Sequence, residues 1–201
     1  MKLDWKYLIG AILVWGFAQA EAVPGPKQQA GQNPGAIDAE AEIERARSAI
    51  GEFASALQSE LKSAMKEGGP VNAIGVCKTE AMTITQTVAA DQGLQLSRVS
   101  MRNRNPSNAP LDWQKTVLES FEGRKNSGEN PASLTWHEIT EIDGRQQFRF
   151  MKAIPTAPIC LQCHGSSIAP GVKARLDELY PQDKATGFEA GDIRGAFVVT
   201  R

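Results

Sequence analysis

The spacing of the hydrophobic residues changes along the chain, from intervals of three and four residues to alternation. The first half carries an apolar stripe at helical spacing, formed by Ala41, Ile43, Ala46, Ile50, Phe53, Leu57, Leu61 and Met65. This stripe predicts a long helix from the N-cap Asp38 to about Lys66. Gly68-Gly69-Pro70 is expected to end it. A second helix is expected over 71–90, ended by Asp91-Gln92-Gly93.

The second half of the chain predicts strands. They are expected over four segments: 94–102, 133–142, 146–154 and 193–200. Asp143-Gly144 between the second and third is typical of a hairpin turn. Short helices are expected over 112–121 and 171–179. Because the helices come first and the strands follow, the predicted class is α+β with an antiparallel sheet.

The first twenty residues have the pattern of an export signal. Lys2 and Lys6 precede an apolar run over 7–17, and Ala-Gln-Ala ends at Ala20 as a small-x-small cleavage motif. The run is short for a membrane span, although an uncleaved anchor stays an alternative. We therefore expect a periplasmic protein, cleaved near Ala20 or Ala22.

The remaining chain predicts one folded domain. Residues 21–37 are rich in Pro, Gly and Gln, which predicts a disordered leader before a domain over 38–201. The chain of 201 residues holds 22 Lys and Arg against 23 Asp and Glu, a net charge of -1. No basic block suggests nucleic acid, and no later apolar run predicts a membrane span.

The segment Cys160-Leu161-Gln162-Cys163-His164 has the spacing of a c-type haem attachment motif. Its two thiols can add to the vinyl groups of one porphyrin, which leaves His164 as an axial ligand to the iron. A zinc site is the main rival and needs two more ligands, for which Cys77 and His137 are available. A thioredoxin-like pair lacks the flanking strand and helix. One covalent haem c is the favoured reading.

The second axial ligand is open from the residues alone. Cys77 lies on the apolar face of the second predicted helix, and it is either a ligand or a small buried hydrophobe. His137 is expected to face water from a strand. Of the methionines, Met101 and Met151 are expected in the core.

Three arginines, Arg98, Arg102 and Arg104, cluster before a Pro-containing loop. Guanidinium groups pair well with carboxylates, so these residues are candidates to bind the haem propionates. A solvated basic edge is the alternative.

Several stretches resemble one family of single-haem c-type domains in periplasmic or lumenal proteins. The family includes a cyanobacterial haem protein and sensory domains of bacterial signalling proteins. The matching stretches, in family order, are 73–77, 98–106, 108–110, 160–165, 180–188 and 191–197. The resemblance implies a PAS-like fold, with an antiparallel sheet flanked by helices. It also implies axial ligation by His164 and Cys77.

Three functions remain open at this point. Family members are proposed as sensors of redox state or of diatomic gases such as CO and NO, and this is our first expectation. Because no output module follows the haem domain, a sensor would need a signalling partner protein. A low-potential electron carrier with a redox partner would use the same ligands. A peroxidase-like enzyme would need an open iron face, with His137 as the spare histidine.

Overall fold

A computed structural model describes residues 37–201 of the protein. The predicted signal peptide and nearly all of the predicted leader fall within residues 1–36, outside the described part. In residues 37–201, no helix is long and apolar enough to cross a membrane.

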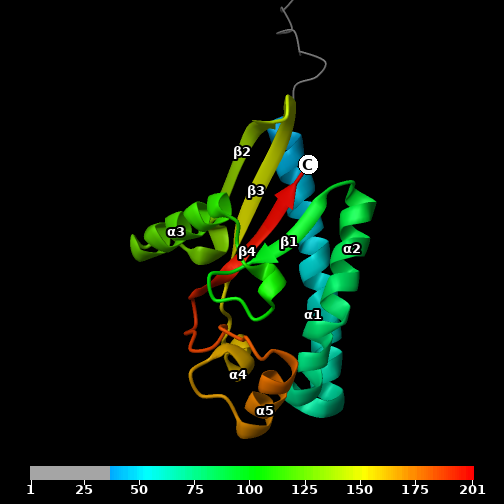
Figure 1. The fold of residues 1–201 in the computed structure, drawn as a ribbon, viewed down its shortest axis with the longest axis vertical. Helices are drawn as coiled ribbons and strands as arrows, with labels where there is room; N and C mark the ends of the chain where they lie inside the picture. The colour runs from blue at the N-terminus through cyan, green and yellow to red at the C-terminus, as the bar shows by residue number, and fades with distance from the viewer. Residues whose placement is uncertain (1–36) are drawn as a thin grey trace, which may run out of the picture. The chain divides into compact units, whose positions relative to one another are not determined.

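The described part is α+β, as predicted (Figure 1). Its helices are α1 (Ala39–Lys78), α2 (Glu80–Gln92), α3 (Asp112–Asn126), α4 (Leu161–His164) and α5 (Pro170–Leu179). Its strands are β1 (Gln95–Val99), β2 (Thr135–Ile142), β3 (Arg145–Pro155) and β4 (Ile193–Thr200). They form one antiparallel sheet in the order β1-β4-β3-β2. The hairpin at Asp143-Gly144 is confirmed, with φ of 51° and 73° at its two residues.

The long first helix begins and breaks where the sequence predicts. The Asp38 carboxylate accepts hydrogen bonds from the N–H groups of Glu40 and Ala41. The helix is interrupted at Gly68 and Gly69 and resumes at Pro70. Gly69 has φ 67° and ψ -164°, which a residue with a Cβ rarely adopts.

The second predicted helix, over 71–90, is divided in two at Thr79. The N–H and the hydroxyl of Thr79 both donate to the carbonyl of Gly75. The chain reverses at Gly68-Gly69, so residues 70–78, the short arm of α1, run back with α2 beside the longer part of the helix (Figure 1).

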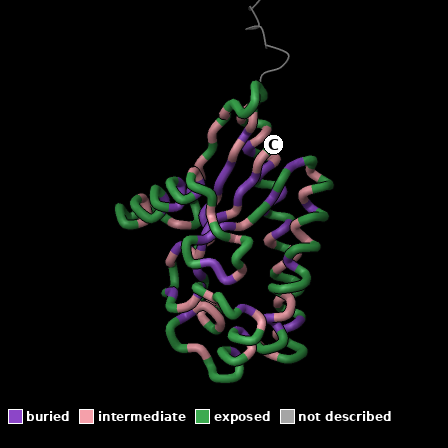
Figure 2. The backbone as a smooth tube through the Cα atoms, in the orientation of Figure 1, coloured by how far each residue is buried: buried purple, intermediate pink, exposed green. Residues whose placement is uncertain are grey.

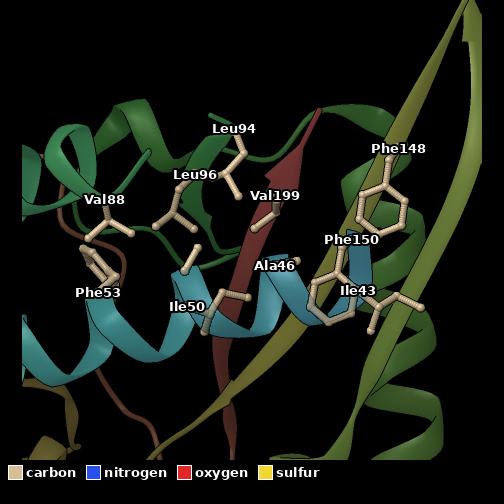
Figure 3. Close-up of a cluster of buried hydrophobic side chains, with 11 residues drawn as sticks. Ile43, Ala46, Ile50, Phe53, Val88, Leu94, Leu96, Phe148, Phe150 and Val199 are labelled. Carbon is tan, nitrogen blue, oxygen red and sulfur yellow. The ribbon is translucent and has the colours of Figure 1, made fainter. Parts of the chain in front are cut away.

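Helices cover both faces of the sheet, and successive side chains along each strand point to opposite faces. Phe148 and Phe150 of β3 point toward α1 and α2, where they pack on Ile43 (Figure 3). Met151 and Ala153 of the same strand join the α3 side. Figure 2 shows the buried residues concentrated along the strands and the inner sides of the helices.

One end of the sheet gathers the segments that build the site. β1 and β3 end there, and β4 begins there. The chain that leaves β3 forms α4 and α5 beyond this end (Figure 1). Val172 and Leu176 of α5 pack on Ile74 in the short arm of α1. The arm, α4 and the loops after β1 and α5 thus meet in one place.

Candidate functional site

The five-residue motif lies on a short helical turn at the end of the sheet. Cys160 closes a 3-10 turn over Pro158–Cys160, and α4 carries the rest of the motif. The motif faces a cavity of about 130 Å³. The cavity is lined by Leu61, Met65, Ala73, Ile74, Cys77, Arg104, Ile159, Cys160, Gln162, Cys163 and His164.

Four potential ligand side chains line this cavity: Cys77, Cys160, Cys163 and His164. Nevertheless, among residues 37–201, no three His, Cys, Asp or Glu side chains are grouped closely enough to hold one metal ion. His137 is exposed on β2 and does not line the cavity. This arrangement does not suit a compact zinc site, whose ligands converge on one ion. It suits a broad planar group with attachment points at its edge and ligands at its centre.

The imidazole of His164 is oriented for ligation. Its Nδ1 lies 2.7 Å from the carbonyl oxygen of Ala185. Because a carbonyl oxygen only accepts, Nδ1 carries the proton and Nε2 keeps its lone pair for a metal. Arg194 on β4 places its Nε 3.2 Å from the same Nδ1. Because Nδ1 carries a proton in this tautomer, the charged guanidinium of Arg194 lies close to it without donating a hydrogen bond to it.

The surroundings of His164 keep it neutral. Burial and the nearby charges of Arg194 and Arg104 lower the pKa of His164 to about 3. The imidazole is therefore uncharged at neutral pH, which is the form that binds iron.

Cys77 also faces the cavity, from the short arm of α1. Cys77 is an exposed residue by its accessible surface, although protein atoms are packed around its thiol. Burial raises the pKa of the Cys77 thiol, while the charges of Arg98, Arg104 and Arg194 oppose that rise. The thiol is thus protonated in the free site, and a bound cation would be needed to draw off its proton.

The three predicted arginines have different surroundings. Arg104 is buried, pairs with Asp183 at 3.0 Å, and donates to the carbonyl of Cys163 at 2.6 Å. Arg102 donates to the carbonyl of Thr186, and its guanidinium lies over Phe188. Arg98 stacks on Phe53 and lies close enough to Cys77 for their charges to interact.

A second pocket of about 140 Å³ collects positive charge beside His164. Arg98, Arg104 and Arg194 all line it. Within residues 37–201, the one ion pair formed by these three joins Arg104 to Asp183. The guanidinium charges of Arg98 and Arg194 therefore have no carboxylate partner in the described part of the chain, and they lie in a pocket that is shielded from water. Burying such charges is costly unless anions balance them. The two propionates of a haem carry that charge, so the residues present fit a haem.

Some site residues received no role from the sequence. Arg194, Asp183 and Ala185 surround His164 and Arg104, and Phe188 meets the His164 ring edge-on at 6.3 Å. These four residues lie in the stretches 180–188 and 191–197. Those stretches carry the family resemblance, but they do not indicate what each residue contacts.

Two other expectations have outcomes here. Met151 is fully buried in the sheet, as predicted. The prediction that Met101 lies in the core is wrong, because 51% of its surface is exposed. It follows β1 in a turn and lines an open groove of about 540 Å³ beside α3.

The fold and the site together define an α+β domain in which the motif over 160–164 and a helical cysteine, Cys77, line one cavity at the end of the sheet. A family model described as Tll0287-like matches residues 32–201, so the chain belongs to the Tll0287-like family. The predicted family resemblance is thereby confirmed.

A solved structure supports the same fold. The crystal structure of the cyanobacterial heme-protein Tll0287 matches with a TM-score of 0.63 and 23% sequence identity. The match covers 82% of this chain and 96% of that chain. No curated protein sequence gives a significant match. The likeness establishes the α+β arrangement with its long N-terminal helix.

Proposed function

We propose that this protein binds one haem c, with thioether bonds from Cys160 and Cys163 and axial ligands from His164 and Cys77. The observation that carries the proposal is the meeting of these four side chains around one cavity, next to a pocket with unbalanced arginine charge. The solved relative is a heme-protein by its own description. When bound, the haem supplies an iron that changes oxidation state and binds diatomic gases.

Each part of the site has a task in this proposal. Cys160 and Cys163 hold the macrocycle even when an axial bond breaks. The carbonyl of Ala185 fixes the ring of His164. Arg98 and Arg194 line the pocket beside His164 and have no carboxylate partner among residues 37–201, so we assign the propionates to them. Arg104 in the same pocket is paired with Asp183, and Arg102, which donates to the carbonyl of Thr186, does not line the pocket.

The cavity holds only part of a macrocycle. Its volume of about 130 Å³ lies below the roughly 300–1,000 Å³ of typical ligand pockets. Ile159 lines it and has 58% of its surface exposed, so it stands at the mouth. One haem edge would therefore lie at the surface, where a partner protein could reach it.

We propose that the protein senses redox state or a diatomic gas in the periplasm. Cys77 lies on the short arm 70–78, between the break at Gly69 and the irregularity at Thr79. Release of Cys77 from iron would remove the bond between this element and the haem, and a shift of the arm against α5 would be the two-state change a sensor needs. A separate protein would read that movement.

The exposed mouth also favours a second candidate, a low-potential electron carrier. Such a carrier would keep both ligands on reduction, whereas a sensor would lose Cys77. The peroxidase-like alternative has little support, because His137 lies on β2 away from the cavity.

The test is reduction of the exported protein with and without CO, followed by absorption spectroscopy. A sensor should lose its thiolate spectrum on reduction and bind CO. Unchanged ligation that resists CO would overturn the sensor in favour of the carrier. The Cys77→Ser variant should keep the attached haem and lose the thiolate spectrum. A spectrum identical to that of the wild type would exclude Cys77 as the ligand.

A further inference from the structure

The cavity contains a second sulfur donor besides the cysteines. Met65 lines it together with Cys77 and His164. We propose that Met65 is the alternative axial ligand, which binds the iron when Cys77 leaves on reduction. This inference rests on the proposed haem site, and it names the sixth ligand of the iron in the reduced protein.

The break in α1 brings the two sulfur residues to the same cavity. Met65 belongs to the long part of the helix and Cys77 to the short arm. They are twelve residues apart, about 18 Å along an unbroken helix. The backbone turns at Gly69, and the Asn72 side chain donates to the carbonyl of Ala64 at 3.2 Å across the break. The two parts of α1 therefore fold toward each other around the cavity.

Met65 is distinguished from the other methionines by its position. Met82 is exposed on α2, Met101 is exposed beside α3, and Met151 is buried in the sheet. Among the methionines of residues 37–201, Met65 alone lines the cavity that holds His164. It is half-buried, and its unbranched side chain has the rotational freedom to turn toward the cavity centre.

The two sulfurs prefer different oxidation states. A thiolate donates charge and stabilises ferric iron, whereas a neutral thioether opposite histidine favours the reduced state and raises the potential. In the proposed exchange, a one-electron donor protein reduces the iron. The bond from iron to Cys77 breaks, and Cys77 takes a proton from solvent to become a thiol. Met65 then donates a sulfur lone pair to the vacant position.

This exchange would link the electron to movement of the arm. In the oxidised state the arm is tied to the haem through Cys77. In the reduced state the long part of α1 would hold the iron through Met65, and the arm 70–78 would lose its bond to the haem while keeping its packing on α5. The break at Gly69 lies between the two attachment points, so each part can be held without the other.

The experiment compares Met65→Leu with Met82→Leu, since leucine keeps the volume of methionine and removes the sulfur. Ferric spectra should be the same for the wild type and both variants. Ferrous wild type and Met82→Leu should be low-spin and six-coordinate. Ferrous Met65→Leu should lose that spectrum, become five-coordinate and bind CO faster, because no ligand has to leave first.

Two outcomes would overturn the inference. One is a ferrous wild type that is five-coordinate or keeps thiolate. The other is a ferrous Met65→Leu variant identical to the wild type, which would make Met65 a packing residue beside the haem. A second comparison is independent of reduction. Ferric Cys77→Ser should become low-spin through Met65, and adding Met65→Leu should make it high-spin. A ferric wild type without a thiolate signal would instead refute the proposed haem ligation itself.

Discussion

Asp183→Asn should destabilise the protein strongly, because it leaves the Arg104 charge buried without its partner. Both side chains are only 9% exposed, and they meet at 3.0 Å. Asparagine keeps the Oδ1 acceptor that binds the N–H of Ala185, so the variant isolates the charge. Removing one partner of a buried ion pair costs about 3–5 kcal/mol. At about 2–4 °C per kcal/mol for a domain of this size, the melting temperature should fall by roughly 6–20 °C.

The assay is thermal and urea denaturation followed by circular dichroism. The matched control is Glu138→Gln, which breaks a pair with Arg149 on the sheet surface at a similar distance of 2.9 Å. Because Glu138 is 37% exposed, the control should cost less than about 1 kcal/mol. Equal losses for Asp183→Asn and Glu138→Gln would refute the view that burial of the Arg104 pair holds the loop around the site.

Three further predictions concern packing, pH and potential. Phe121→Ala should lower the free energy of unfolding by about 3–5 kcal/mol in urea denaturation, because its ring is fully buried between α3 and the sheet. Lys125 lowers the pKa of the Asp192 carboxyl through a 2.8 Å hydrogen bond. The pair therefore stabilises the protein at pH values above the ordinary pKa of aspartate. In urea denaturation, the wild type should be more stable than Lys125→Met at neutral pH, and this difference should vanish as the pH falls through the lowered pKa of Asp192. A difference that does not change with pH would contradict this. Arg194→Gln should lower the midpoint potential in redox titration, since a positive charge beside His164 disfavours ferric iron, and Arg194→Lys should keep it.

The element pattern was predictable because it depends on local spacing. The strand over 193–200 and the helix ending at Leu179 lie where the alternation and the turn residues predict them. The irregularity at Thr79 was not predictable, because the apolar pattern continues through it. The end of α3 was placed too early, at 121 in place of Asn126, because its last turn is polar.

The site was predictable to the extent that its chemistry is local in sequence. The motif over 160–164 indicates haem attachment by spacing alone. The roles of Arg194 and Met65 depend on contacts between distant segments, made at the end of the sheet and across the break in α1. The sequence offered Arg98, Arg102 and Arg104 as candidates to bind the haem propionates. Only the fold shows that Arg194, which lies 92 residues after Arg102, shares a pocket with Arg98.

The central claim is most directly tested by the mass and the ferric EPR spectrum of the protein exported from a host that attaches haem c. We expect a mass increase of one haem that survives denaturation, and a low-spin signal typical of a thiolate opposite histidine. A protein without covalent haem, or a high-spin ferric signal, would contradict the assignment of Cys160, Cys163, His164 and Cys77.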